Sequence, residues 1–171
     1  MKEAIQTLIT SDKMAHAFEY LKQDEAHTID QQIELVQISS FSPFEEKRAI
    51  RFKELLTEAG LDPVMDEVHN VYAHIHGTGN GPTLYVSAHL DTVFPPETPL
   101  PVKREGTKIY APGIGDDTRG LAEILTLARA IKESGLKPVG DIIIGGNVGE
   151  EGLGDLRGMR HFFSKNADKV R

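Results

Sequence analysis

Hydrophobic and polar positions along the chain follow two different periods, and these predict alternating helices and strands. Residues 118–134 place apolar side chains three and four positions apart, as in a helix with one buried face. The apolar stripe of this predicted helix consists of Leu121, Ile124, Leu125, Ala128 and Ile131. Three shorter runs, 71–75, 83–88 and 142–144, are apolar or alternate and therefore predict strands. The last is solidly β-branched, which is typical of a central strand covered on both faces.

Helix signals fill most of the remaining chain. The first forty residues are predicted to be helical, with Thr28 at a capping-box start. Ser42, followed by a proline and a glutamate, predicts a helix that runs to about residue 59. Its expected apolar face is Ile50, Leu55, Leu56 and Ala59. A final helix is expected over 155–164, and four prolines in 95–101 predict an extended loop. This order of elements predicts an α/β fold: a three-layer α/β/α sandwich with a mostly parallel, mixed sheet.

Composition narrows the class of protein. The 171 residues suit one domain, and 19 basic against 26 acidic residues give a net charge of −7. That charge disfavours nucleic acids and anionic membranes as partners. The absence of cysteine excludes disulfides, thiolate metal ligands and thiol nucleophiles, and it fits a cytoplasmic protein. The first residues lack a signal-peptide pattern, and no apolar run approaches the ~18 residues of a membrane span.

The first segment with candidate chemistry is Ser87–Val93, which follows a predicted strand. His89 and Asp91 are two positions apart, so an extended backbone points both side chains the same way. A carboxylate in that position can accept the second imidazole N–H and orient the ring as a metal ligand. A His–Asp hydrogen bond at a strand end, without any metal, is the alternative interpretation.

The second segment is a glycine-rich turn that leads into the helix at 118. It carries Asp116 and Asp117 next to each other. Helix capping is the ordinary use of an aspartate at this position, but one aspartate is enough to cap. The other carboxylate is therefore a candidate to bridge metal ions.

The third segment, Gly145–Gly152, contains Glu150 and Glu151 between glycines directly after a buried strand. Paired negative charge and flexible glycines do not stabilise a sheet edge, whereas a nearby cation would relieve the repulsion. One glutamate could bind a metal ion while the other takes a proton from a water molecule.

Together the three segments, in this order and spacing, resemble the co-catalytic zinc exopeptidases and amidases. That family includes glutamate carboxypeptidase, peptidase T, succinyl-diaminopimelate desuccinylase, acetylornithine deacetylase and the aminoacylases. The resemblance runs from the Ser42 helix to the end of the chain. It departs from the family pattern at Thr118-Arg119-Gly120, where a lysine and two glycines are usual.

The resemblance implies a role for each matching residue. His89, Asp116 and Glu151 are expected to bind metal, with Asp116 bridging two Zn²⁺ ions, for which Co²⁺ or Mn²⁺ could substitute. Glu150 is expected to act as general base, and Asp91 to orient His89. Asp117 is expected to follow Asp116, often through a cis peptide bond in this family.

The resemblance also implies a longer protein. Residues 1–171 would be the N-terminal portion of the catalytic domain, without the lid or dimerisation domain, the C-terminal half and two further ligands. Asp168 is placed too early to be one of these ligands, and His74 with His76 is a weak alternative metal pair. The remaining histidines are assigned to the surface or to packing: His16, His27, His69 and His161.

The resulting hypothesis is a zinc-dependent hydrolase that cleaves the amide bond of small peptides or N-acyl amino acids. The complete protein could form a homodimer, and the 171-residue chain is expected to be inactive alone. Two alternatives stay open at this point. One is a non-catalytic domain that keeps the fold, and the other is a neighbouring aminopeptidase family with a similar set of His, Asp and Glu residues.

Overall fold

The computed structural model describes residues 2–170 and contains the alternating helices and strands that the apolar pattern predicts. The helices are α1 (Lys2–Ile9), α2 (Asp12–Gln23), α3 (Glu25–Val36), α4 (Glu46–Glu58), α5 (Thr118–Ser134) and α6 (Arg157–Asn166), with a short 3₁₀ helix, η1 (Gly152–Gly154). The strands are β1 (Val64–Met65), β2 (Val71–Ile75), β3 (Leu84–His89), β4 (Lys103–Glu105), β5 (Lys108–Tyr110) and β6 (Ile142–Asn147).

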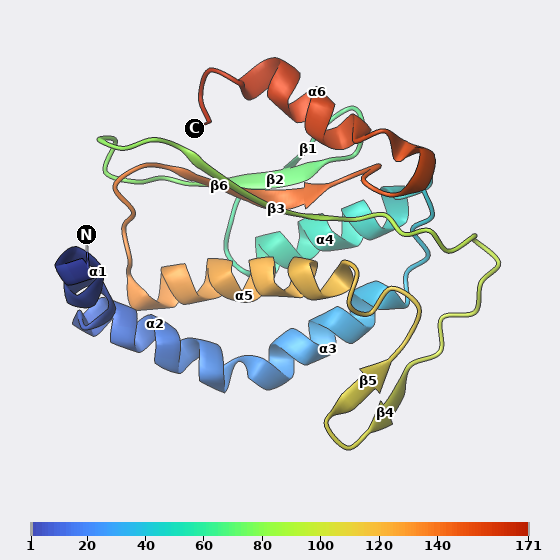
Figure 1. Ribbon diagram of the computed structural model, residues 1–171, viewed down its shortest axis with the longest axis horizontal. Helices are drawn as coiled ribbons and strands as arrows, with labels where there is room; N and C mark the ends of the chain where they lie inside the picture. Colours follow the sequence, from blue (N-terminus) through green and yellow to red (C-terminus); the bar gives the residue numbers. More distant parts are fainter. Residues whose placement is uncertain (1, 171) are drawn as a thin grey trace.

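A mixed sheet in the order β1-β2-β6-β3 forms the middle layer of the fold. Strands β3 and β6 are parallel, whereas β2 runs antiparallel to both β1 and β6. Helix α6 lies on one face of this sheet, and helices α4 and α5 lie on the other (Figure 1). The predicted α/β/α sandwich is therefore confirmed. Helices α2 and α3 add a further layer against α5, and β4 and β5 form a separate hairpin.

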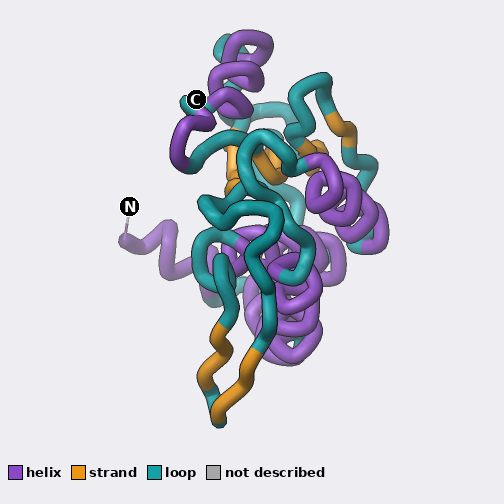
Figure 2. Tube along the Cα trace, turned by 90° about the vertical axis from the view of Figure 1, so that its right-hand side faces the viewer, coloured by secondary structure: helices purple, strands orange, loops and turns teal. Residues whose placement is uncertain are grey.

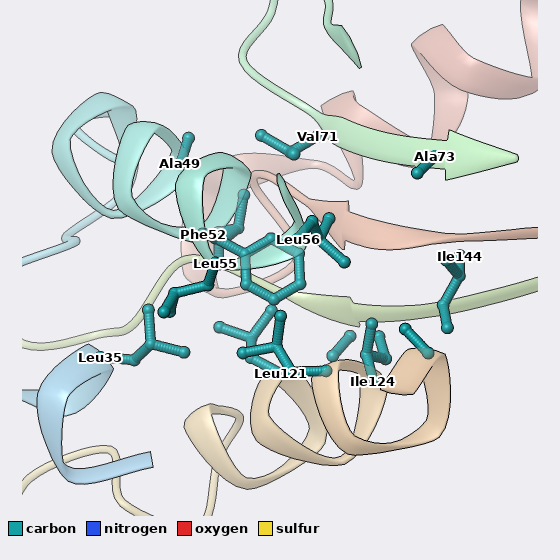
Figure 3. Packing of buried hydrophobic residues seen from close by; sticks show 14 of the residues in the cluster. Leu35, Ala49, Phe52, Leu55, Leu56, Val71, Ala73, Leu121, Ile124 and Ile144 are labelled. Atoms are coloured by element: carbon teal, nitrogen blue, oxygen red, sulfur yellow. The ribbon is translucent and has the colours of Figure 1, made fainter. Parts of the chain in front are cut away.

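The main core lies between the sheet and the layer of α4 and α5 (Figure 3). The apolar stripe predicted for α5 is buried except for Ile131, which is only partly covered. In α4 the prediction that Ile50 is buried is wrong, because this residue is 43% exposed. Ala49 and Phe52 turn inward instead and are fully buried. The other three residues of the predicted face, Leu55, Leu56 and Ala59, are buried as expected.

Two predicted helix starts are also wrong. Thr28 lies inside α3, where its hydroxyl donates to Asp24, the residue that precedes the helix. Ser42 lies inside a turn in which the Phe44 amide donates to the Phe41 carbonyl, and α4 begins only at residue 46. The Ser42 hydroxyl accepts a hydrogen bond from Arg157 on another helix. A long-range polar contact therefore takes the place of the predicted local cap.

The three segments with candidate chemistry meet at one edge of the fold. Because β3 and β6 are parallel and in register, their last residues, His89 and Asn147, are paired neighbours. The turn before α5 arrives at the same edge, and Figure 2 views the molecule from this side, where loops dominate. None of the helices within residues 2–170 has the length and apolar character needed to cross a membrane.

Candidate metal centre

His89 and Asp116 face each other across the edge of the sheet. His89 is the last residue of β3, and its side chain is only 11% exposed. Its Nε2 atom lies 2.8 Å from Oδ1 of Asp116, whose side chain is 76% exposed. Burial opposes the charged imidazole, but the Asp116 hydrogen bond and the charges of Asp117, Asp91 and Asp116 outweigh it and raise the pKa of His89.

Asp117 caps α5 and links this helix to β3 by hydrogen bonds. One carboxylate oxygen accepts the Gly120 amide at 3.0 Å, and the other accepts the His89 backbone amide at 3.1 Å. A Cβ atom on Gly120 would lie 2.3 Å from Asp117 Oδ1, so this close approach requires glycine. Capping therefore uses Asp117 and leaves Asp116 free to face His89. The peptide bond between the two aspartates is cis, as the resemblance implies.

Asp91 ties the end of β3 to the Glu150–Glu151 segment. Its fully buried carboxylate accepts the backbone amides of Glu150 at 3.0 Å and of Glu151 at 2.8 Å. The carboxylate does not accept the expected hydrogen bond from the imidazole, because Nδ1 of His89 is 3.8 Å from Asp91 Oδ1. The same nitrogen is 3.1 Å from the Asp91 backbone carbonyl. The Asp91 main chain therefore contacts the ring, while its side chain holds the loop.

Glu151 completes a cluster with His89 and Asp116, which we call the donor cluster. One ligand atom from each of the three residues lies within 4.8 Å of the others. Burial, together with the charge of Asp116, raises the pKa of Glu151, and the charge of His89 opposes this shift. The negative charges of Asp116 and Glu151 therefore repel each other, and a bound cation would remove this repulsion.

Two clefts open beside the donor cluster. The first, of about 510 Å³, contains both His89 and Glu150 and is bordered by Met159 and Phe163 of α6. The second, of about 480 Å³, is lined by Glu151 and bordered by Phe41 and Arg157. Glu150 therefore lines the first cleft and Glu151 the second.

The donor cluster fits a divalent transition metal. One imidazole and two carboxylates are a donor set that suits Zn²⁺, and Co²⁺ and Mn²⁺ accept the same atoms. Within residues 2–170 no second group of three such side chains converges in this way. His74 and His76 stack with ring centroids 6.0 Å apart, and the His76 side chain is 80% exposed, so they lie outside any such group. Asp168 lies in the turn after α6.

Sequence reasoning missed a buried arginine behind the centre. The Arg48 guanidinium donates two hydrogen bonds to the Ile38 carbonyl and one, at 2.9 Å, to the Leu90 carbonyl. Burial lowers the pKa of Arg48 to about 10, against the opposing charge of Asp91. Arg48 is 1% exposed and supports the backbone between His89 and Asp91. A charged residue on the inner face of α4 was the signal that could have revealed it.

Several known peptidases are similar to this chain. The chain is 38% identical over 84 residues to carboxypeptidase G2 of Pseudomonas sp. strain RS-16, an alignment that covers 48% of the chain and 20% of that protein. A tripeptidase from Staphylococcus aureus matches with a TM-score of 0.60 and 31% identity, covering 74% of the chain and 37% of that structure. Aminopeptidase PepT from Bacillus cereus matches with a TM-score of 0.61 and 26% identity, covering 72% of the chain and 36% of that structure. The chain therefore spans between about a fifth and somewhat over a third of these proteins.

The family model for peptidase family M20/M25/M40 matches residues 85–170, which contain all three segments of the candidate centre. The match includes β3 with His89, the turn with Asp116 and the loop with Glu151. It decides between the two families that the sequence left open, and the chain belongs to the peptidase family M20/M25/M40.

Proposed function

We propose that this chain supplies part of the active site of a metal-dependent hydrolase that cleaves the amide bond of small peptides or N-acyl amino acids. The observation that carries the proposal is the convergence of His89, Asp116 and Glu151 within 4.8 Å, with Glu150 in the adjoining cleft. The printed activities of the similar proteins, a carboxypeptidase, a tripeptidase and an aminopeptidase, support peptides as the substrate class.

We assign the binding of Zn²⁺ to the donor cluster, and we keep Co²⁺ and Mn²⁺ as substitutes. When bound, the metal supplies a Lewis acid that polarises the scissile carbonyl and makes water easier to deprotonate. The exposed Glu150 carboxylate accepts that proton and delivers it to the leaving nitrogen. Asp91 holds both glutamates through their amides, and Asp117 fixes His89 through its backbone amide.

We also propose that the 171-residue chain has little turnover by itself. Three donors converge within residues 2–170, whereas the family resemblance implies two metal ions with a larger set of ligands. The limited coverage of the similar proteins supports the same proposal. A lid domain and a homodimer in a longer protein stay predictions from the family resemblance. The cytoplasmic location stays a prediction from the cysteine-free sequence.

Metal titration of the purified chain tests the proposal directly. We expect Zn²⁺ to bind to the wild-type chain, and the His89→Ala variant to bind at least about 10-fold more weakly. His74→Ala is the matched control, since it removes an exposed histidine from β2. Equal affinity in the wild type and His89→Ala would contradict the metal centre. A robust zinc-dependent peptidase rate from the 171-residue chain would instead contradict its proposed inactivity.

Hydrolysis assays with dipeptides and N-acyl amino acids test the reaction itself, and they should use both this chain and any longer product of its gene. We expect metal-dependent turnover from the longer product. Metal binding without turnover on either class of substrate would favour the non-catalytic alternative.

A further inference from the structure

The loop that carries Glu150 and Glu151 is packed directly beneath an arginine. Gly149 has a positive φ of 66°, and a Cβ atom at this position would lie 2.3 Å from Nη1 and 2.8 Å from Cγ of Arg157. Gly149 therefore lacks a side chain for two independent reasons, its backbone conformation and the arginine stacked above it. Arg157 is the first residue of α6 and covers the backbone just before the two glutamates.

Arg157 is itself held by the turn before α4. Its Nη2 atom donates to Glu45 Oε2 at 2.5 Å, and its Nη1 atom donates to the Ser42 hydroxyl at 3.1 Å. Glu45 is completely buried, while the Arg157 side chain is 30% exposed. Within residues 2–170, the other carboxylate oxygen of Glu45 has no hydrogen-bond partner. The charge of Glu45 therefore depends on Arg157, and the pair fixes the guanidinium over Gly149.

The glutamate loop is thus held at two points. Asp91 accepts the Glu150 and Glu151 amides, and the Arg157 side chain packs against Gly149, the residue just before them. A loop with glycines at 149, 152 and 154 loses much conformational entropy when it is ordered, so it needs such constraints. Neither contact involves the carboxylates that face the clefts.

We propose that Arg157, locked by Glu45, is a positioning residue that holds Glu150 and Glu151 in register with His89 and Asp116. This inference rests on the proposed function for its consequence, because Glu151 is a donor and Glu150 the base only in that scheme. Arg157 acts through the backbone at Gly149 and touches no reacting atom.

Replacement of Arg157 by methionine tests the proposal, since methionine keeps an apolar stem and removes the guanidinium. The single variant leaves Glu45 buried without a partner, so the decisive variant combines Arg157→Met with Glu45→Gln. Arg51→Met is the matched control. Arg51 has a similar side-chain exposure of 26% and also pairs with a carboxylate at 2.5 Å, but it lies on α4 and bonds Glu34.

The first readout is amide hydrogen exchange, which needs no metal. We expect the Glu150 and Glu151 amides to exchange at least about 10-fold faster in the double variant, while the amides of β6 and α5 keep their wild-type rates. Arg51→Met should leave all of these rates unchanged. An Arg157→Lys variant, which keeps a charge for Glu45, should restore part of the protection of the two amides.

The second readout is Co²⁺ binding, followed by its visible absorption spectrum and by titration. We expect at least about 10-fold weaker binding and an altered spectrum in the double variant. Unchanged loop exchange would overturn the positioning role and leave the proposed function intact. A uniform rise in exchange across the molecule would overturn it as well, because it would reveal a general structural role. A wild-type chain that binds no Co²⁺ would refute the metal centre, while the exchange data would still decide whether Arg157 orders the loop.

Discussion

At the residue scale, the side chain of Asp91 organises the centre in a way that spacing alone does not reveal. The His-x-Asp pattern predicts that Asp91 orients His89, and the two residues are adjacent in the structure. The carboxylate is nevertheless used by the Glu150 and Glu151 amides, which lie about sixty residues away along the chain. The spacing of residues predicts contacts only within one strand. It cannot show that two backbone N–H groups of a distant loop donate to the same carboxylate.

Replacement of Asp91 by asparagine should loosen this loop. The asparagine oxygen can accept one amide, but its NH₂ group then faces the other N–H group. We expect a loss of about 1–3 kcal/mol in the free energy of unfolding. We also expect Zn²⁺ binding to weaken by about 10- to 100-fold. Chemical denaturation and metal titration measure the two effects, and Asp30→Asn is a control at an exposed aspartate. Wild-type values for both would argue against Asp91 as the link.

Replacement of Glu150 by glutamine separates binding from proton transfer. Glu150 lies outside the donor cluster, so the variant should keep wild-type affinity for Zn²⁺. The amide cannot accept the proton, and we expect kcat to fall by about 100- to 10,000-fold in an active, longer gene product. Calorimetric titration and a peptide hydrolysis assay provide the two measurements. Near-normal turnover would assign the base to another residue.

At the scale of elements, local signals predicted the helix whose cap is local and failed where the cap is replaced by a distant partner. Helix α5 begins at Thr118 as predicted, because Asp117 caps it within its own turn, and Gly135 ends it with φ of 63°. Helix α4 begins late, since the Ser42 hydroxyl is used by Arg157. Strands β2, β3 and β6 were also predicted, because their apolar side chains pack into the core. The short strands β1, β4 and β5 were not predicted.

Replacement of Gly120 by alanine tests the local cap of α5. In an ordinary helix this change stabilises the protein by roughly 0.5–1 kcal/mol. Here the new methyl group would lie 2.3 Å from the Asp117 carboxylate, and overpacking of this kind costs about 1–3 kcal/mol. We therefore expect a net loss of stability in thermal unfolding. Gly115→Ala is the control, because a Cβ atom there meets nothing within 4 Å. A more stable Gly120→Ala variant would show that the cap is dispensable.

At the scale of the whole molecule, one buried ion pair joins the outer helices to the layer that covers the sheet. Asp24, between α2 and α3, accepts hydrogen bonds from Arg129 of α5 at 2.5 and 3.0 Å and from Thr126 at 2.7 Å. Both charged residues are buried. The two partners are 105 positions apart, so the sequence predicted the helices but could not predict their attachment.

This attachment should make stability depend on pH in the acid range. Burial disfavours the ionised form of Asp24, but hydrogen bonds from Arg129 and Thr126 and the charge of Arg129 outweigh it and lower the pKa of Asp24. The folded state thus favours the carboxylate. Its contribution is present above the ordinary aspartate pKa and is lost as the pH falls through the lower, folded-state pKa.

The variant Asp24→Asn should isolate that contribution, because it leaves Arg129 buried without its counter-charge. At neutral pH we expect the free energy of unfolding to fall by about 3 kcal/mol. The difference in the free energy of unfolding between the wild type and the variant, the stability gap, should shrink as the pH drops below the folded-state pKa of Asp24, where the wild-type side chain is also neutral. Asp30→Asn, at an exposed pair with Arg104, should change stability by less than about 1 kcal/mol at any pH. Urea denaturation curves over a series of acid pH values measure the gap. A gap that stays constant with pH would show that the hydrogen bonds of Asp24, and not its charge, attach the outer helices to α5.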